Sequence, residues 1–431
     1  MIGMRNTTMM DTSDRPTTMA APAARCRFCN AALRHTFVDL GMSPLCESYL
    51  AGDQLNSMEP FYPLHVKVCE ECCLVQLEQY VSAEHIFTEY AYFSSFSDSW
   101  LKHCANYVDM ISGRLQLGSQ NLVVELASND GYLLQYFVKK GIPVLGVEPA
   151  VNVARVAEQK GVSTLIKFFG SSCALEMVAN GQMADLIIGN NVLAQVPDIN
   201  DFVGGIGILL KPGGVATLEF PHLVCLMHEN QYDTIYHEHF SYFSLLTVER
   251  IFAAHGLTVF DLDEVPTHGG SLRIYVRHAG DKSKPVTPTV VSLRERELAL
   301  RMDCMETYAL FSEQVKESKR ALLELLIRLR REGKRIVAYG APGKGNTLLN
   351  YCGIRTDFLD FTVDRNPYKQ GRFLPGTRIP IYAPERIKEN RPDYIVILPW
   401  NLKTEIVSQL AYAREWGGKF IVPIPLAQIL D

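Results

Sequence analysis

The sequence lacks the features that mark membrane, nucleic-acid-binding and secreted proteins. No apolar run among its 431 residues approaches the about 20 residues that a membrane-spanning helix needs. The net charge is only −5, and no run of lysine and arginine marks a surface for nucleic acid. Residues 1–24 carry no apolar core of a secretion signal, and their composition, rich in Met, Thr, Ala and Pro, predicts a disordered leader. These absences predict a cytoplasmic protein with no membrane or nucleic-acid partner.

The cysteines indicate a metal site. In a reducing compartment, the 11 cysteines are expected to be metal ligands or free thiols before disulfides. Cys26 and Cys29 form one C-x-x-C pair, and Cys69 and Cys72 form a second. Each pair can present two thiolates from one turn, and two such turns complete a closed tetrahedral zinc site without a catalytic position. Cys73 is an alternative ligand beside Cys72, and free or redox-active thiols are the alternative to a structural zinc.

The spacing of apolar segments predicts an α/β protein with several domains. A small, loop-rich zinc module is expected over residues 25–84, a first domain with βαβ rhythm over 85–285, a helical linker over 286–332 and a second Rossmann-like domain over 333–431. Strands are expected at 121–126, 143–147, 185–189, 215–220, 271–278, 335–339, 361–364, 394–398 and 420–422. Helices are expected at 85–115, 132–140, 151–160 and 201–210, and one long charged helix at 290–332.

Polar residues follow the expected strands of the first domain in a recognisable order. Glu125 ends the first strand ahead of a turn of small residues, and Glu148 ends the second, where a carboxylate can accept both hydroxyls of a ribose. The third strand ends in Asn190 and Asn191, and a Lys-Pro-Gly-Gly turn precedes the fourth. The series resembles the Class I S-adenosylmethionine (SAM) methyltransferases, although a nucleotide-binding domain of another kind is the alternative.

That resemblance implies a set of residues at the cofactor. They are Glu125, Ala127, Asn129, Asp130, Gly131, Glu148, Asn190 and Asn191. The family usually has glycine at the position of Ala127, and alanine is expected to fit there with a negative φ.

The segment Tyr236-His237-Glu238-His239 gathers titratable groups between two tyrosines, the second being Tyr242. Histidine titrates nearest neutral pH and is the commonest general base. An extended segment would place the two histidines on one side and Tyr236 and Glu238 on the other, whereas a turn would let them converge. A solvated polar loop is the alternative to a catalytic cluster.

The combination of these features with a Gly-rich turn, Gly340 to Asn346, and the segment 363–371 resembles the sugar-nucleotide C-methyltransferases of deoxysugar biosynthesis. The resemblance runs from about residue 25 to the C-terminus. It implies SAM-dependent methylation, as in antibiotic biosynthesis, of the carbon next to the ketone (often C3) of a dTDP-linked 4-keto deoxysugar, by a monomer or an oligomer of unspecified size. It implies His239 as the base, with Glu238, Tyr236 and Tyr90 beside it. The substrate-binding residues that it implies are Tyr92, Gln195, Gly340, Lys344, Gly345, Asn346 and Lys369.

Some features favour other functions. Gln195 stands where the family often has histidine, which places the contribution of this loop, or the identity of the sugar, in question. Asp364 lies 24 residues after Gly340 at a later strand end, so NAD is a rival ligand, although Lys344 interrupts the dinucleotide pattern. A zinc-bearing methyltransferase of a macromolecule and a non-catalytic scaffold are further alternatives. His222, His228, His255 and His268 are expected to be structural, and His268, in His-Gly-Gly, is the weakest case for such a role.

Overall fold

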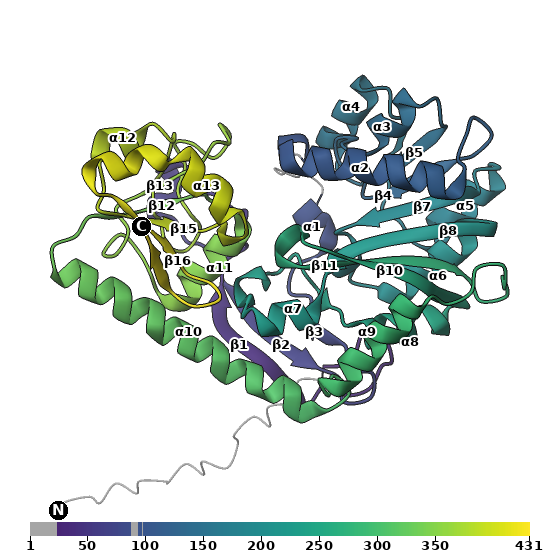
Figure 1. Cartoon of the computed structure of the whole chain (residues 1–431), viewed down its shortest axis with the longest axis horizontal. Coiled ribbons are helices and arrows are strands. Elements are labelled where there is room, and N and C mark those ends of the chain that lie inside the picture. Colours follow the sequence, from purple (N-terminus) through teal and green to yellow (C-terminus); the bar gives the residue numbers. More distant parts are fainter. Residues whose placement is uncertain (1–23, 88–93, 97) are drawn as a thin grey trace, which may run out of the picture.

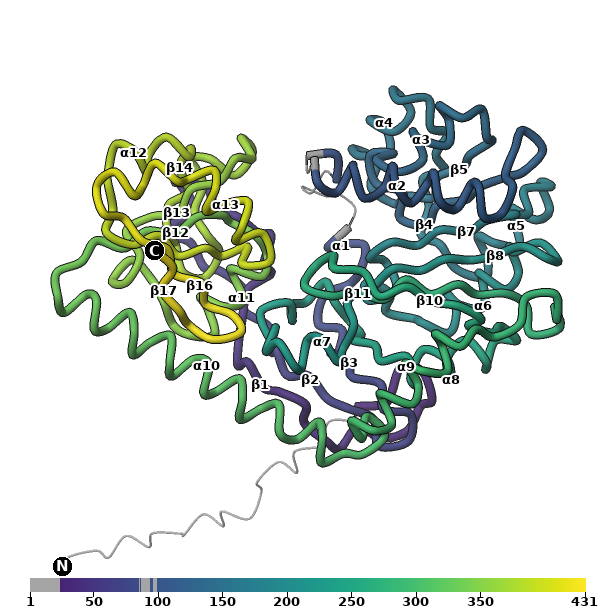
Figure 2. Tube along the Cα trace, viewed as in Figure 1, coloured from purple at the N-terminus to yellow at the C-terminus, as the bar shows by residue number. Residues whose placement is uncertain are grey.

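Three β-sheets organise the part of the chain that this computed structural model describes, residues 24–87, 94–96 and 98–431 (Figure 1). The seven-stranded sheet and the C-terminal six-stranded sheet stand on either side of the molecule, and the strands β1 to β3 lie below and between them (Figures 1 and 2). Most of the leader predicted over residues 1–24 falls outside the described residues, as do Tyr90 and Tyr92.

The first sheet is antiparallel and has the order β1-β2-β3-β9. Its strands are β1 (His35–Ser43), β2 (Tyr62–Val68), β3 (Val75–Leu77) and β9 (Ser241–Tyr242). Leu64, Val66 and Val68 alternate with half-exposed residues, which is the period of a strand with one covered face. The prediction of a loop-rich module is therefore wrong for β1 and β2. The fourth strand of this sheet, β9, comes from the segment that immediately follows His239, and Gln76 of β3 pairs with Ser241 of β9.

The second sheet has seven strands in the order β10-β11-β8-β7-β4-β5-β6, and only β11 runs against its neighbours. The strands are β4 (Val123–Leu126), β5 (Val144–Val147), β6 (Thr164–Leu165), β7 (Ala184–Asn190), β8 (Leu210–Pro221), β10 (Leu257–Val265) and β11 (Ser271–His278). The predicted βαβ rhythm is confirmed. The chain moves outward from β4 through β5 and β6 and then returns to β7 on the other side of β4. A crevice for a ligand is expected at such a reversal, outside the carboxyl ends of the strands.

Helices and short 3-10 turns connect the strands of these two sheets. The helices are α1 (Ala83–Phe87), α2 (Asp98–Leu115), α3 (Leu134–Lys139), α4 (Val151–Gln159), α5 (Ser171–Ala179), α6 (Ile199–Leu209), α7 (Leu223–His228) and α8 (Leu245–Ala254). The 3-10 turns are η1 (Gly52–Asn56), η2 (Ser94–Phe96), η3 (Leu193–Gln195), η4 (Tyr232–Thr234) and η5 (Thr267–Gly269). The Asp198 side chain accepts the backbone N–H of Asp201 at 3.0 Å, which fixes where α6 begins.

The third sheet has the order β14-β13-β12-β15-β16-β17, and its first five strands are parallel. Its strands are β12 (Ile336–Tyr339), β13 (Thr362–Val363), β14 (Ile381–Tyr382), β15 (Tyr394–Ile397), β16 (Lys419–Val422) and β17 (Gln428–Leu430). The connecting elements are α11 (Gly343–Cys352), α12 (Arg386–Asn390), η6 (Trp400–Leu402), α13 (Lys403–Gln409) and η7 (Ala411–Trp416). The predicted second Rossmann-like arrangement is confirmed.

Two helices, and not the predicted single one, link the second sheet to the third. They are α9 (Pro288–Ala299) and α10 (Met305–Arg331), and Arg301, with φ 56°, breaks the helix between them. Figure 1 shows α10 running under β1 towards the C-terminal sheet. Phe311 of α10 stacks on Phe37 of β1 with ring centroids 4.6 Å apart. One continuous apolar core therefore joins the first sheet, α10 and the third sheet.

Candidate functional site

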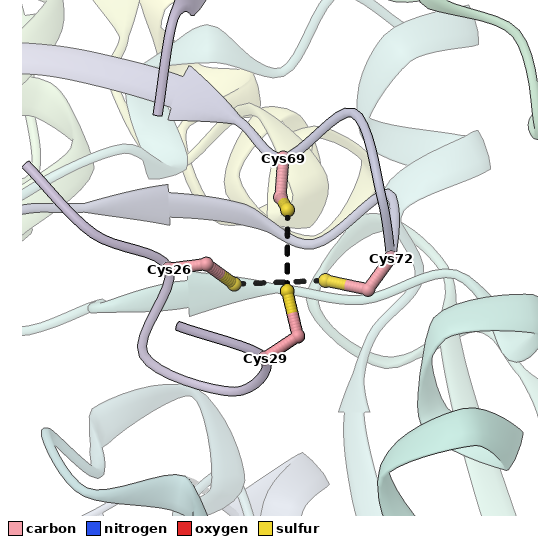
Figure 3. Close-up of side chains that lie close together, drawn as sticks. All are labelled: Cys26, Cys29, Cys69 and Cys72. Atoms are coloured by element: carbon pink, nitrogen blue, oxygen red, sulfur yellow. Dashed lines mark hydrogen bonds between the residues drawn. The ribbon is translucent and has the colours of Figure 1, made fainter. Parts of the chain in front are cut away.

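Four cysteine side chains converge at the edge of the first sheet (Figure 3). The sulfurs of Cys26 and Cys72 are 3.6 Å apart, those of Cys29 and Cys69 are 3.5 Å apart, and all four lie within 4.8 Å of one another. Thiolates bound tetrahedrally to zinc at about 2.3 Å lie at about these separations, so the residues fit the metal. Cys73 adopts a left-handed conformation, φ 60°, and is not one of the four.

Gln76 connects this cysteine cluster to the rest of the site. Its side chain is 2% exposed, and its Nε2 donates to Cys26 Sγ at 3.1 Å while its Oε1 accepts the backbone N–H of Arg27 at 2.9 Å. The Arg27 guanidinium in turn donates to the carbonyls of Leu77 and Pro197, the latter at 2.7 Å. The ligand-bearing turns are thereby joined to β3 and to the loop that follows η3.

A cavity of about 930 Å³ opens between the three sheets. The second sheet contributes the strand-end residues to its wall, the third sheet contributes the Gly-rich turn, and the segment between η4 and β9 lies between them. The lining includes Ala127, Asn129, Glu148, Asn190, Asn191, Gln195, Tyr236, Glu238, His239, His268, Gly340, Lys344, Asp364, Arg365 and Lys369. Such a volume suits a small-molecule site, for which cavities of about 300–1,000 Å³ are typical.

The crevice at the reversal of the second sheet fits SAM. Glu148 stands at the carboxyl end of β5, lines the cavity and is 5% exposed. Its two carboxylate oxygens accept the backbone N–H groups of Asn129 and Ala150, each at 2.9 Å. Each oxygen keeps a second lone pair, so the carboxylate is oriented and can still accept ribose hydroxyls. Burial raises the pKa of Glu148, and the two backbone N–H groups oppose this rise.

The turn after β4 differs from expectation in its backbone. Ala127 has φ 56° and not a negative value, so this position is left-handed, like Asn129 at φ 48° and Gly131 at φ 72°. A left-handed alanine costs about 1–2 kcal/mol, which explains why glycine is favoured in such a turn.

Three residues expected at the cofactor stand outside the cavity lining. Glu125 is fully buried, and this burial raises its pKa well above the ordinary value. Asp130 is paired with Lys160 at 3.1 Å. Gly131 serves packing, because a Cβ there would lie 3.2 Å from Ala157 of α4. These three residues hold the shape of the turn. Because none of them lines the cavity, the lining does not support the prediction that they contact the cofactor.

The segment before β9 folds as a turn, which sorts its side chains. The backbone N–H of His239 donates to the carbonyl of Tyr236 at 2.9 Å. Tyr236, Glu238 and His239 line the cavity, whereas His237 is 4% exposed, shares a hydrogen bond with the Pro63 carbonyl at 3.1 Å and is not part of the lining. The turn therefore brings three of the four side chains to one site and directs His237 towards β2.

His239 is held as a neutral base. Its Nδ1 lies 3.0 Å from the carbonyl of Thr234, which can only accept, so the ring proton is on Nδ1 and Nε2 keeps its lone pair. Burial lowers the pKa of His239 to about 4, with further lowering by His268 and the Lys344 ammonium. The Tyr236 ring lies against it with centroids 4.2 Å apart. The tautomer is thus fixed by a backbone carbonyl, and Glu238 Oε1 accepts a hydrogen bond from the Cys46 thiol at 3.5 Å.

The opposite wall carries the lysines of the C-terminal part. Lys344 Nζ donates to Asn401 Oδ1 at 3.0 Å and lies 4.6 Å from the centre of the Trp400 ring. Burial lowers the pKa of Lys344. Lys369 is 9% exposed, and its ammonium donates to the Tyr49 hydroxyl at 2.8 Å and the Ala341 carbonyl at 2.9 Å. Lys369 therefore braces the wall, and Lys344 is the better placed of the two for a substrate.

The remaining predicted substrate residues divide in the same way. Gly340, with φ 89°, and Gln195 line the cavity, whereas Gly345 and Asn346 do not. Asn346 is 1% exposed and its amide donates to the Cys46 carbonyl. Tyr90 and Tyr92 lie outside the described residues, and the nearby Ser94 backbone N–H donates to Asn129 Oδ1 at 3.1 Å.

His268 is the lining residue that sequence reasoning assigned to structure. It lies in η5 ahead of β11, lines the cavity, and its Nε2 is 3.1 Å from Asn191 Nδ2. The signal that could have identified it is the His-Gly-Gly sequence just before a strand, because two glycines there allow an unusual backbone.

Comparisons with known proteins match each part of the chain. Three family models cover residues 26–87 (zinc binding domain), 102–262 (methyltransferase domain) and 266–425 (C-methyltransferase C-terminal domain). The chain is 36% identical over 410 residues to the C-methyltransferase NovU of Streptomyces niveus, which covers 95% of this chain and 97% of that protein.

Solved structures resemble one part of the chain. The match to a SAM-dependent methyltransferase from Anabaena variabilis spans 41% of this chain and 84% of the chain in that structure, at 15% identity and a TM-score of 0.34. The magnesium protoporphyrin IX methyltransferase of Synechocystis, with bound SAM, covers 42% of this chain and 81% of its own, at 15% identity and a TM-score of 0.31. Among the described residues, none of the helices combines the length and apolar character required to cross a membrane.

Proposed function

Because this chain belongs to the SAM-dependent C-methyltransferases that carry an N-terminal zinc module, we propose that it methylates the carbon next to the ketone of a dTDP-linked 4-keto deoxysugar, often C3. One observation carries the proposal. His239 presents an unprotonated Nε2 to a cavity that reaches both the SAM crevice and the Gly-rich turn of the C-terminal part. A carbon-directed methylation needs a base at that point, because a carbon next to a ketone becomes nucleophilic only after it loses a proton.

His239 removes this proton. Its lowered pKa keeps the imidazole neutral at pH 7, and the Thr234 carbonyl orients Nε2 towards the cavity. In the step, the C–H bond breaks, its electron pair forms a C=C bond, the carbonyl π pair moves onto oxygen, and the proton goes to Nε2. A positioned base contributes about 10²–10⁴-fold to such a step.

The second sheet prepares the methyl transfer. SAM, when bound, supplies an electrophilic methyl group to the enolate carbon. Glu148 holds the ribose, and Asn190 and Asn191 line the wall that continues from this crevice towards His239. Fixing the two reacting carbons in one cavity removes much of the entropic barrier of a bimolecular reaction.

The third sheet supports recognition of the nucleotide sugar. The Lys344 ammonium and the Arg365 side chain line this wall, and both are cations suited to a diphosphate. The carboxylate of Asp364 accepts the Ala341 backbone N–H at 2.7 Å and thereby shapes the turn, which favours a nucleotide sugar over a dinucleotide ribose at this position. A cavity closed by three parts of one chain also suits a small molecule better than a macromolecule. Gln195 adds a neutral amide to the wall, which we propose contacts the sugar.

Solvent exchange tests the proposal without methyl transfer. The wild-type protein, given dTDP-4-keto sugars in D₂O without SAM, should exchange the proton next to the ketone, as detected by NMR or mass spectrometry. His239→Asn should slow this exchange and lower kcat by about 10²-fold or more, while substrate binding is largely kept.

His237→Asn is the matched control, because its side chain contacts Pro63 outside the cavity. Exchange at the wild-type rate in His239→Asn, together with its loss in His237→Asn, would transfer the role of base to His237. If the wild-type protein neither exchanges nor methylates any of the keto sugars, the proposed substrate class is wrong.

A further inference from the structure

The backbone around His268 is arranged at some cost. His268 has φ 54°, and Gly269 and Gly270 follow with φ 92° and 112°. A Cβ on Gly269 would lie 2.8 Å from the Trp400 ring, and one on Gly270 would lie 2.8 Å from Cys225 Sγ. The two glycines adopt these angles without steric cost, so the strain lies at His268, a non-glycine residue in the left-handed region, and such strain is concentrated at functional sites.

The imidazole of His268 is oriented by its neighbours. Asn191 Nδ2 donates to its Nε2 at 3.1 Å, and the ring lies against Trp100 with centroids 5.4 Å apart. Because Nε2 accepts, the ring proton of the neutral imidazole is on Nδ1. Within residues 24–87, 94–96 and 98–431 we find no hydrogen-bond acceptor for this Nδ1–H, although the side chain lines the cavity. A donor therefore remains for a ligand.

His268 and His239 line the same cavity. Burial lowers the pKa of His268 to about 4, and the Lys344 ammonium lowers it further, as it does for His239. Both imidazoles are thus neutral at pH 7. The neutral base has its lone pair directed to the cavity, and the neutral donor has its N–H available there, so the pair offers both of the functions that proton removal beside a ketone requires.

We propose that His268 is a second catalytic residue, whose Nδ1–H donates a hydrogen bond to the ketone oxygen while His239 Nε2 removes the adjacent proton. This inference rests on the proposed keto-sugar substrate. The proton passes to His239, the C–H electron pair forms the C=C bond, and the carbonyl π pair moves onto the oxygen that His268 contacts. The hydrogen bond from Nδ1–H to this oxygen strengthens as negative charge develops on the oxygen, which is the condition for lowering the barrier.

The Tyr236 hydroxyl is the competing donor, but its placement favours it less. The Tyr236 ring packs on His239 itself, so that it belongs to the side of the base. His268 comes from a different element, the connection between β10 and β11, and can approach the ketone oxygen while His239 approaches the neighbouring C–H. A donor and a base on separate elements can contact two adjacent atoms of one substrate.

Two substitutions separate a donor from a structural residue. His268→Phe keeps an aromatic ring against Trp100 and removes the N–H. His268→Asn tolerates the left-handed backbone and carries an amide N–H close to the position of Nδ1. Both proteins are compared with the wild type for exchange of the α-proton in D₂O without SAM, with melting temperature, zinc content and SAM affinity measured in parallel. His228→Asn, at an exposed site, is the matched control.

The expected result is a loss of about 10²-fold or more in the exchange rate of His268→Phe, since one donor to an oxyanion contributes 10²–10³-fold. His268→Asn should keep the rate within about tenfold of the wild type, and SAM affinity should not change. Exchange at the wild-type rate in His268→Phe, or an equal loss in both variants, would overturn the inference. If the wild-type protein does not exchange the α-proton of any keto sugar, the proposed function is overturned instead.

A measurement on the wild-type protein completes the test even where a variant does not fold. In ¹⁵N-histidine-labelled protein, NMR correlation of the ring nitrogens with the ring C–H protons should identify the Nδ1–H tautomer for His268. An Nε2–H tautomer would leave Nδ1 without a proton to donate and would overturn the inference.

Discussion

Removing the buried side-chain amide of Gln76 should weaken zinc binding and thereby loosen the turn that carries His239. In Gln76→Ala the N–H donor to Cys26 Sγ is lost, and the Arg27 backbone N–H loses its acceptor. A hydrogen bond to a charged acceptor contributes about 1.5–3 kcal/mol, and an unsatisfied buried donor costs about 1–3 kcal/mol. Because a groove opened by alanine can admit water, we expect part of this sum, a 10- to 100-fold loss of zinc affinity, as is usual for groups that orient metal ligands.

The same substitution should lower turnover only because it displaces the turn that carries His239. Gln76 pairs with Ser241, and the Leu77 backbone N–H donates to the Phe240 carbonyl at 3.0 Å, so loosening β3 releases the strand that follows His239. Competition with a colorimetric chelator measures zinc affinity, and α-proton exchange at each zinc occupancy measures the base. Exchange should fall in proportion to zinc loss and return when zinc is restored.

Gln159→Ala, at the exposed end of α4, is the matched control and should leave both quantities unchanged. The reasoning would be refuted if Gln76→Ala bound zinc as tightly as the wild type. It would also be refuted if the zinc-depleted protein exchanged the α-proton at the full rate.

Three further predictions address the second sheet and the histidines. Glu148→Ala should weaken SAM binding at least tenfold in calorimetric titration, since it removes a charged acceptor for the ribose; unchanged affinity would place SAM elsewhere. The free energy of unfolding should fall by up to about 3 kcal/mol for each of His239 and His268 as pH is lowered from 6.5 to 4, because the unfolded imidazoles bind protons first. The pKa of His222 is raised to about 9 by its hydrogen bonds with Cys225 and Glu297, so its contribution to the free energy of unfolding is lost as pH rises from 6.5 to 9. Thermal unfolding of a double His239→Asn, His268→Asn variant should therefore depend less on pH between 6.5 and 4, and an equal dependence would contradict the pKa values assigned to these two histidines. Ala127→Gly should leave the melting temperature unchanged or raise it, because relief of left-handed strain offsets the greater entropy of glycine; a clear decrease would argue against φ 56° at this position.

Local patterns in the sequence were sufficient for the secondary structure near the site. The strand ends that carry Glu148 and Asn190 were identified because buried strands stop at polar residues, and the four cysteines because their spacing is a property of two local turns. The long helix over 290–332 was wrong at residues 300–304, where Arg301 adopts a left-handed backbone that helical periodicity does not encode.

Contacts between distant segments could not be predicted in this way. The pairing of β3 with β9, the Thr234 carbonyl at His239 and the use of Lys369 as a brace all depend on how the three sheets meet. Glu125 and Asn346 have side chains suited to bind the cofactor and the substrate, but both are buried in the fold and neither lines the cavity. The backbone at Ala127 was misjudged because a sign of φ cannot be read from one alanine.

The origin of β9 limits how relatives of this chain can exchange parts. The first sheet takes three strands from residues 35–77 and its fourth from residues after 240. A crossover placed anywhere between β3 and β9, including at the proposed boundary near residue 84, would pair a β3 from one parent with a β9 from another. Hybrids that take the 232–243 segment and the zinc module from the same parent keep the pairing of β3 with β9 intact, so these two segments are best exchanged together.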